Sequence, residues 1–384
     1  MTDPTDPAAS PEPRPEPPPE AAGPAEPSEP AEPTPAPDPM PPPGPVPAVE
    51  STRRLLGASF DLLGRASDDM RRASFYIGMI VLVTVAPAVL ATWALEVAAL
   101  HHTESGLERL VGQAGYSWYG ILVSLAVVGL AVASVESRTM AASILGGRVA
   151  GRPITTRQAL QRSRMVFWRA VVGSLIVGIP VAIAQGILTG VGEALVGPQT
   201  DLSIVITTLA AALVGAPLAY ILTGIVLGDV DPFTATRRSF RVFRARKMAA
   251  VIVAVFETAA VLLVVLGLGA GLDLGLRLFD ALGVGADSGP AGLAFVTVGI
   301  VVLVFAFGTL VYTALAISIA PQVVMFVGLT RATIGLDHVR PGGRRDPATP
   351  VAGQRRFRWL TLPMLAALAF QVAALAIVLA RLAG

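Results

Sequence analysis

Glu257 is the residue that points most directly to chemistry, because it is a carboxylate inside a long apolar run. The run covers residues 248–272, and at 1.5 Å per residue Glu257 would lie about 15 Å beyond Lys247 along a helix. An ionisable group at that depth in a bilayer is a candidate for proton relay or cation binding. The alternative is a hydrogen-bonded glutamate that ties helices together, which we favour because transport pathways usually hold more than one such group. The polar residues of other apolar runs that could bond to it are Gln185, Thr207, Thr223 and Gln322.

Two basic segments, residues 155–169 and 232–246, share a pattern that predicts contact with a membrane surface. In each segment small and apolar residues fall on one side of a helix, and most of the arginines fall on the other. Basic amphipathic helices lie in the head-group region and attract anionic lipids. The arginines that we expect to meet head groups are Arg157, Arg162, Arg164, Arg169, Arg237, Arg238, Arg241 and Arg244. The alternative is that these arginines only set the orientation of the chain in the membrane.

Other residue types that carry chemistry are scarce. The chain has no cysteine and three histidines, which are His101, His102 and His338. A weak metal site near Glu104 and Glu108 is one interpretation of the first two, but adjacent residues point apart and an ordinary solvated loop is favoured. No nucleotide-binding, zinc-protease or serine-hydrolase motif occurs in the sequence. We therefore expect no catalysis, no metal and no cofactor.

The composition is that of a membrane protein with a separate polar tail. Of the 384 residues, 53% are hydrophobic and 15% are charged, and the mean hydropathy is +0.65. Residues 1–50 hold 20 of the 32 prolines, and ten acidic residues against one basic residue, Arg14. This tail predicts a disordered, partly polyproline II spacer. A plain solvated spacer is favoured, and the alternative is that a protein partner docks on its Pro-rich motifs. The rest of the chain has 28 basic and 17 acidic residues, a net charge of +11, and nothing in it predicts a nucleic-acid partner.

Apolar runs of about 20 residues or more predict seven membrane spans. They cover residues 75–95, 110–135, 170–192, 202–228, 248–272, 288–330 and 361–380. With the N-terminus in the cytoplasm, the inner segments carry 25 basic residues and the outer segments three, as expected from the positive charge of cytoplasmic loops. Before the first span, residues 51–72 predict an amphipathic surface helix. We expect an all-α, multi-pass protein of a bacterial plasma membrane, with its C-terminus outside.

An internal repeat relates the loop after the second span to the loop after the fourth. With a shift of 76 residues there are five identities, in which Ala159, Arg162, Ser163, Val166 and Phe167 meet Ala235, Arg238, Ser239, Val242 and Phe243. Thr155 and Asp231 coincide as candidate N-caps. Each unit is therefore predicted to be a span, a surface helix and a span, and the two units form parallel repeats.

Four sequence motifs occur in a recognisable order. They are Leu-Leu-Gly-Ala-Ser-Phe-Asp-Leu-Leu at 55–63, Ala-Leu-Gln-Arg-Ser-Arg at 159–164, Arg-Arg-Ser-Phe-Arg-Val-Phe-Arg at 237–244 and Gly-Leu-Asp at 335–337. This order resembles the membrane domain of glycerophosphoryl diester phosphodiesterases and its stand-alone bacterial relatives. The resemblance implies a six-span membrane domain over residues 51–338. The phosphodiesterase activity of that family belongs to a separate soluble barrel, and no soluble segment of this sequence approaches the length of about 250 residues that such a barrel needs.

The expected organisation has four parts. A tail covers residues 1–50, the membrane domain 51–338, a basic cytoplasmic loop 339–359 and an additional C-terminal span 360–384. We expect a non-catalytic membrane protein that interacts with anionic lipids or acts as a scaffold in the cell envelope. The alternative is a small-solute transporter in which Glu257 is the coupling carboxylate.

Overall fold

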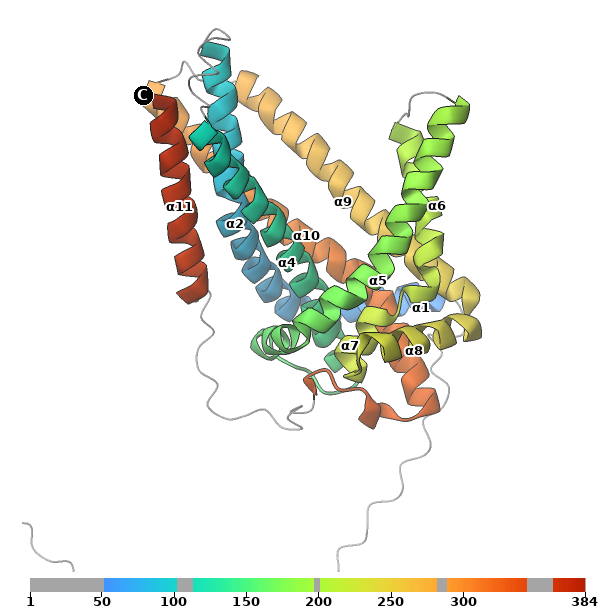
Figure 1. Ribbon diagram of the computed structural model, residues 1–384. Helices are drawn as coiled ribbons and strands as arrows, with labels where there is room; N and C mark the ends of the chain where they lie inside the picture. Colours follow the sequence, from blue (N-terminus) through green and yellow to red (C-terminus); the bar gives the residue numbers. More distant parts are fainter. Residues whose placement is uncertain (1–51, 102–112, 197–200, 282–288, 344–361, 384) are drawn as a thin grey trace, which may run out of the picture. The chain divides into compact units, whose positions relative to one another are not determined.

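The computed structural model describes residues 52–101, 113–196, 201–281, 289–343 and 362–383, and all regular elements in these ranges are helices (Figure 1). The all-α prediction is therefore confirmed for the described part of the chain. The predicted Pro-rich tail, His102 with Glu104 and Glu108, and most of the basic loop lie outside the described residues.

The helices differ widely in length, from short turns to one of 45 residues. In chain order they are α1 (Thr52–Arg65), α2 (Ser67–His101), α4 (Gln113–Val149), α5 (Thr156–Val196), α6 (Asp201–Gly215), η2 (Ala216–Leu218), α7 (Ile221–Gly228), α8 (Pro232–Ala245), α9 (Lys247–Ala281), α10 (Gly289–Thr333), η3 (Leu336–His338) and α11 (Leu362–Ala383).

Five stretches among the described residues are long and apolar enough to cross a membrane. They are Ser67–Ala94, Ser117–Val149, Thr156–Ala194, Ser203–Gly228 and Ala294–Thr333. α9 and α11 cover the two other predicted spans, whose passage through the membrane stays a prediction. α10 continues through Pro321 as a single helix, so the long sixth apolar run forms one element.

The two repeats differ in how the surface helix joins the following span. In the first repeat, the predicted surface helix and the third span form one continuous helix, α5, instead of two. In the second repeat, α8 and α9 are separated at Arg246, whose φ of −145° and ψ of 63° lie outside the helical region. The equivalent residue in α5 is Ala170, which is fully buried, whereas Arg246 is exposed. In the first repeat, a small residue fills this buried position. The break at Arg246 therefore keeps a long charged side chain out of the equivalent position in the second repeat.

The fourth predicted span, residues 202–228, is discontinuous in the structure, at the proline within its apolar run. The short helix η2 separates α6 from α7, and Pro217 within it explains the break, because proline lacks an N–H and obstructs the preceding turn. Ser239 of α8 bonds to both sides of the break. Its hydroxyl donates to the Pro217 carbonyl at 2.7 Å and accepts from the Tyr220 N–H at 3.2 Å. A side chain of the surface helix thus satisfies backbone groups that a broken helix leaves without partners.

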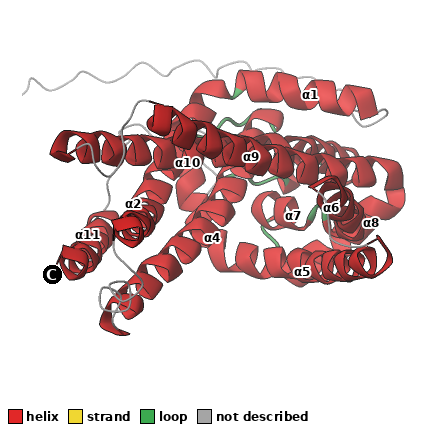
Figure 2. Cartoon of the chain, turned by 90° about the horizontal axis from the view of Figure 1, so that it is seen from above, coloured by secondary structure: helices red, strands yellow, loops and turns green. Residues whose placement is uncertain are grey.

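The closest packing involves α2, which contacts α4, α10 and α11 (Figure 2). Gly78 and Gly308 lie where α2 and α10 cross, and a Cβ atom on Gly308 would lie 2.8 Å from the Cα of Gly78. Small residues at such crossings let membrane helices approach each other closely. α4, which belongs to the first repeat, also contacts α5 and α7, and α10 contacts α7 and α9. The candidate site lies where these helices meet.

Candidate functional site

A cavity of about 480 Å³ lies between the two repeats and α10. Its lining comes from α4 and α5 of the first repeat, from the broken helix and α9 of the second, and from α10. The polar residues of the lining are Ser134, Arg138, Ser174, Glu257, Thr258, Ser318 and Gln322. The other lining residues are apolar or glycine. The cavity therefore combines a small polar region with apolar walls, as small-molecule sites do.

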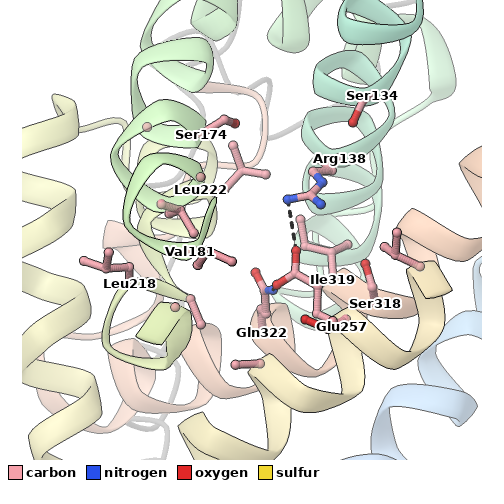
Figure 3. A pocket seen from close by; sticks show the side chains of 18 of the residues that line it. Ser134, Arg138, Ser174, Val181, Leu218, Leu222, Glu257, Ser318, Ile319 and Gln322 are labelled. Atoms are coloured by element: carbon pink, nitrogen blue, oxygen red, sulfur yellow. Dashed lines mark hydrogen bonds and ion pairs between the residues drawn. The ribbon is translucent and has the colours of Figure 1, made fainter. Parts of the chain in front are cut away.

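The two carboxylate oxygens of Glu257 have different partners (Figure 3). Oε1 forms an ion pair with Arg138 of α4, at 2.9 Å from the guanidinium nitrogen. Oε2 accepts a hydrogen bond from the side-chain amide of Gln322 of α10 at 2.7 Å. The side chains of Arg138 and Glu257 are 30% and 21% exposed, so the pair borders the cavity and is not enclosed by protein.

One of the four expected partners of Glu257, Gln322, is in contact with it. The other three bond elsewhere, namely Gln185 to Thr208, Thr207 to the carbonyl of Ser203 and Thr223 to the carbonyl of Tyr220. Glu257 therefore joins α9 to α4 and α10, and it does not bond to these side chains of α5, α6 and α7.

Arg138 is absent from the predicted site residues, because the uncharged run of the second span ends at Val135 and Arg138 counts as a cytoplasmic loop charge. In the structure α4 continues to Val149, so Arg138 lies one helical turn beyond Ser134 and lines the same cavity. The sequence does hold a signal for this, because small and apolar residues continue beyond Arg138 to Gly147. A helix that continues past a charge can carry that charge into the packed interior.

One N–H donor of Arg138 is not used by any group in the described part of the chain. Its Nε is buried and lacks a hydrogen-bond partner among the described residues. A guanidinium has five N–H donors in a fixed arrangement, and leaving a buried donor unpaired costs free energy. The guanidinium that borders the cavity thus has one buried N–H without an acceptor among the described residues, and both oxygens of the neighbouring carboxylate are bonded.

The position of Arg162 corrects the prediction that this residue meets lipid head groups. Its side chain is 1% exposed and reaches the C-terminal end of α7, where it donates to the carbonyls of Ile225 and Val226. The same guanidinium pairs with Asp229 at 3.0 Å. Cations are favourable at a helix C-terminus, because the last carbonyls have no partner within the helix. Arg162 therefore joins the first repeat to the second from inside the protein.

Asp229 follows α7 and binds two arginines. Besides Arg162 it pairs with Arg169, at 3.1 Å. Partial burial by itself raises the pKa of the Asp229 carboxyl, but the charges and hydrogen bonds of Arg162 and then Arg169 outweigh it and hold the pKa below its ordinary value of 3.8. These pairs therefore stabilise the fold fully above that ordinary value, and the stabilisation is lost as the pH falls through the lowered pKa.

The other arginines of the first segment have varied surroundings. Arg169 is partly covered through its contact with Asp229. Arg164 is exposed and donates to the Tyr76 hydroxyl at 3.1 Å, and Arg157 is also exposed. Arg157 and Arg164 are thus the arginines of this segment that lie at the surface.

α8 keeps the amphipathic character predicted for it. Asp231 is its N-cap and accepts a hydrogen bond from the Thr234 N–H at 2.9 Å, as the sequence predicts. Ala235 and Ser239 are buried, and Arg238 is partly buried. The exposed stripe combines aromatic and basic side chains, which are Phe233, Arg237, Phe240, Arg241 and Arg244. Such a mixture is typical of helices that lie in the head-group region of a membrane.

Equivalent residues of the repeat have similar surroundings. Ala159 and Ala235 are both fully buried. Ser163 and Ser239 are buried too, and each hydrogen-bonds to the preceding span. Ser163 bonds to Thr139 of α4, and Ser239 bonds to backbone groups on both sides of the helix break. The structure therefore supports the alignment of the two segments.

Comparison with protein-family models, curated proteins and solved structures gave no match. The resemblance to the membrane domain of glycerophosphoryl diester phosphodiesterases thus stays a prediction. Within the described ranges, no group of three or more histidine, aspartate or glutamate side chains is placed to hold a metal ion. The cavity and the exposed stripe of α8 are the two features of the described structure that bear on function.

Proposed function

We propose that this chain is a non-catalytic, multi-pass membrane protein that moves a small solute through the cavity between its repeats, with Glu257 coupling solute movement to proton movement. The observation that carries this proposal is the Arg138–Glu257 pair in the cavity. Ionisable side chains in the apolar part of a membrane protein are costly and mark substrate or ion pathways. From the sequence, Glu257 stands alone in its apolar run, which favours a structural role. Because Arg138 is a second ionisable group in the same cavity, a purely structural role of Glu257 is no longer favoured.

The energetics of ion pairs give the proposal further support. If the pair only tied α4 to α9, apolar side chains of similar size would serve as well, since replacing a buried ion pair by them is often neutral or stabilising. The pair also keeps part of its surface exposed to the cavity. Because Arg138 and Glu257 border the open space of the cavity, a ligand bound there can replace one of them as the partner of the other.

The broken helix is the second structural support. η2 and the adjoining ends of α6 and α7 contribute Gly215, Leu218, Ala219 and Leu222 to the cavity lining. In several transporter folds, discontinuous helices at the interface of two repeats form the substrate site. The cavity of this chain likewise lies between its two repeats and is lined in part by a discontinuous helix.

The proposal includes the orientation predicted from charge, with seven spans, the N-terminus in the cytoplasm and a bacterial plasma membrane as location. This orientation is supported by contacts between segments that it places on the cytoplasmic side, because these contacts hold the charged ends of different helices close to one another. Arg148 at the end of α4 pairs with Asp69 of α2 at 2.8 Å. Arg152 donates to the carbonyls of Leu336 and Val339, which follow α10.

Proton entry into vesicles tests the transport proposal. The full chain would be reconstituted into liposomes that contain the pH-sensitive dye pyranine, with an acidic outside solution. Four probes would be added in turn: hexyl sulfate as an anion, hexyltrimethylammonium as a cation, alanine as a zwitterion and glycerol as a neutral solute. We expect at least one probe to accelerate proton entry through the native protein, and Glu257→Gln to abolish the acceleration because an amide does not exchange a proton at neutral pH.

Two variants control this experiment. Glu193→Gln makes the same chemical change at an exposed position outside the cavity lining, and it should behave like the native chain. Thermal unfolding of Glu257→Gln shows whether the variant is folded, since glutamine keeps the size and hydrogen-bonding capacity of glutamate. The proposal is wrong if no probe accelerates proton entry, or if folded Glu257→Gln responds as the native chain does.

A second proposed function, binding of anionic lipid by α8, rests on its exposed stripe of Phe233, Arg237, Phe240, Arg241 and Arg244. Phe233 is 71% exposed, which is unusual for a large apolar residue facing water and ordinary for one inserted among lipids. Each basic residue near an anionic membrane surface contributes about 1 kcal/mol. The stripe therefore fits the lipid-interacting role expected from the sequence.

Replacing Arg237, Arg241 and Arg244 together by glutamine should weaken this binding. With three basic residues lost, we expect roughly 3 kcal/mol less attraction to an anionic surface. Enrichment of phosphatidylglycerol over phosphatidylcholine among lipids that co-purify with the protein is the measurement. As a matched control, the same three arginines would be replaced by lysine, which keeps the positive charge and should keep the enrichment. Equal enrichment in the native chain and the glutamine variant would contradict the lipid role of α8.

A further inference from the structure

The cavity has a charged end and an apolar wall. Arg138 and Glu257 lie at the charged end, and Val181, Leu218 and Leu222 lie across the cavity from them (Figure 3). A ligand that matches this lining has one polar head group and an apolar part of a few carbon atoms. The cavity volume of about 480 Å³ is within the range of roughly 300–1,000 Å³ found for small-molecule sites.

Charge balance decides between a head group that is a single cation and one that is a single anion. Among the described residues that line the cavity, Arg138 and Glu257 alone are charged, and their charges cancel. A cation would need to displace Arg138 from Glu257, and Arg138 would then be left without an anionic partner. An anion bound to Arg138 would leave Glu257 as the unpaired charge, but a carboxylate can be neutralised by one proton, whereas a guanidinium cannot lose one. Unpaired charges away from bulk water are costly, so the lining favours an anion that arrives with a proton.

We propose that the cavity binds a small amphiphile with one anionic head group together with one proton, which rests on the proposed transport function and names its substrate class. A proton from water adds to Oε1 of Glu257, and the ion pair with Arg138 breaks. Arg138 then donates the N–H groups released from Glu257 to the oxygens of the head group. Gln322 keeps its bond to Oε2 of Glu257. The net charge of the cavity is zero before and after the step.

No other titratable group competes for this proton within the described lining. Arg138 faces Glu257 from α4, and Gln322 and Ser318 face the cavity from α10. α5 contributes Ser174, and the broken helix contributes no polar side chain to the lining. Within this lining, Glu257 is therefore the group that can take up the proton.

Calorimetry with hexyl sulfate tests the inference, because this probe is anionic at all working pH values and any proton taken up belongs to the protein. The full chain would be titrated in phosphatidylcholine nanodiscs, in two buffers with different protonation enthalpies. We expect one proton to be taken up per anion bound. In the pH range where Glu257 is ionised, the affinity should fall about tenfold per pH unit. A second set of nanodiscs with phosphatidylglycerol shows whether a lipid head group supplies the anion, since that lipid would then compete with hexyl sulfate.

Three variants make the outcome specific. Glu257→Gln should bind hexyl sulfate with no proton uptake, and Glu193→Gln should match the native chain. Arg138→Gln combined with Glu257→Gln leaves a neutral hydrogen-bonding pair, and this folded variant should not bind. Binding by the native chain without proton uptake would overturn the inference, and so would tighter binding of hexyltrimethylammonium.

The vesicle and calorimetric experiments separate this inference from the function on which it rests. Proton entry driven by alanine or by the cation, with no binding of hexyl sulfate, would overturn the anionic substrate class and leave transport in place. Proton-linked binding of hexyl sulfate without proton entry would support the ligand class and overturn transport.

Discussion

Replacing Arg162 by glutamine should lower the free energy of unfolding by about 3 kcal/mol, the largest effect expected for any arginine of the two basic segments. Removing one partner of a buried ion pair typically costs about 3–5 kcal/mol, and Asp229 keeps Arg169 as a second partner, which places the effect at the lower end. The carbonyls of Ile225 and Val226 also lose their donor. Thermal unfolding in nanodiscs, followed by tryptophan fluorescence, is the measurement.

Two further variants show that burial and geometry cause the effect. Arg157→Gln removes the same charge from an exposed position of the same helix, and surface substitutions change stability by about 0.5 kcal/mol or less. Arg162→Lys keeps the charge but loses the planar fork of the guanidinium, so its stability should lie between that of the native chain and Arg162→Gln. Equal stability of Arg162→Gln and Arg157→Gln would contradict the interior position of Arg162.

The sequence predicts the helical class well, because long apolar runs and N-caps are local signals. The prediction that α8 begins after Asp231 is confirmed by the bond from the Thr234 N–H. The break at Pro217 was predictable in kind, since proline lowers helix stability, but the sequence does not say that Ser239 completes the backbone bonds there. That contact joins residues 22 positions apart and depends on tertiary packing.

The site is harder to predict, because Arg138, Glu257 and Gln322 come from three different helices. Glu257 is conspicuous in its apolar run, and Gln322 is one of several polar residues that could meet it. Arg138 cannot be assigned to the site from charge counting, since the same residue serves equally well as a loop charge. Arg162 and Arg157 likewise share a basic segment, and their different environments follow from the position of α7. Charge patterns along a chain predict its orientation in the membrane better than they predict which charges are buried.

A cysteine at position 174 should react with a water-soluble thiol reagent although the residue lies within a predicted span. Ser174 lines the cavity, and the chain has no cysteine of its own, so the introduced thiol is the single reactive group. Only the thiolate reacts, and a thiol forms thiolate when water reaches it. A cavity that admits a solute must also admit water, so Ser174→Cys should be modified rapidly.

Two cysteine variants provide the comparison. Ile179→Cys lies five residues further along α5, at a position that is 54% exposed and outside the cavity lining, where lipid should keep its thiol protonated. Ser143→Cys lies at a fully buried position outside the cavity lining. Both should react slowly with the reagent.

The measurement that tests the central claim most directly is the rate at which 2-sulfonatoethyl methanethiosulfonate modifies these three variants in opened vesicles, with and without hexyl sulfate. The cavity account predicts fast modification of Ser174→Cys, slow modification of Ile179→Cys and Ser143→Cys, and protection of Ser174→Cys by hexyl sulfate. Modification of Ser174→Cys as slow as that of Ile179→Cys would contradict a water-filled, ligand-binding cavity between the repeats.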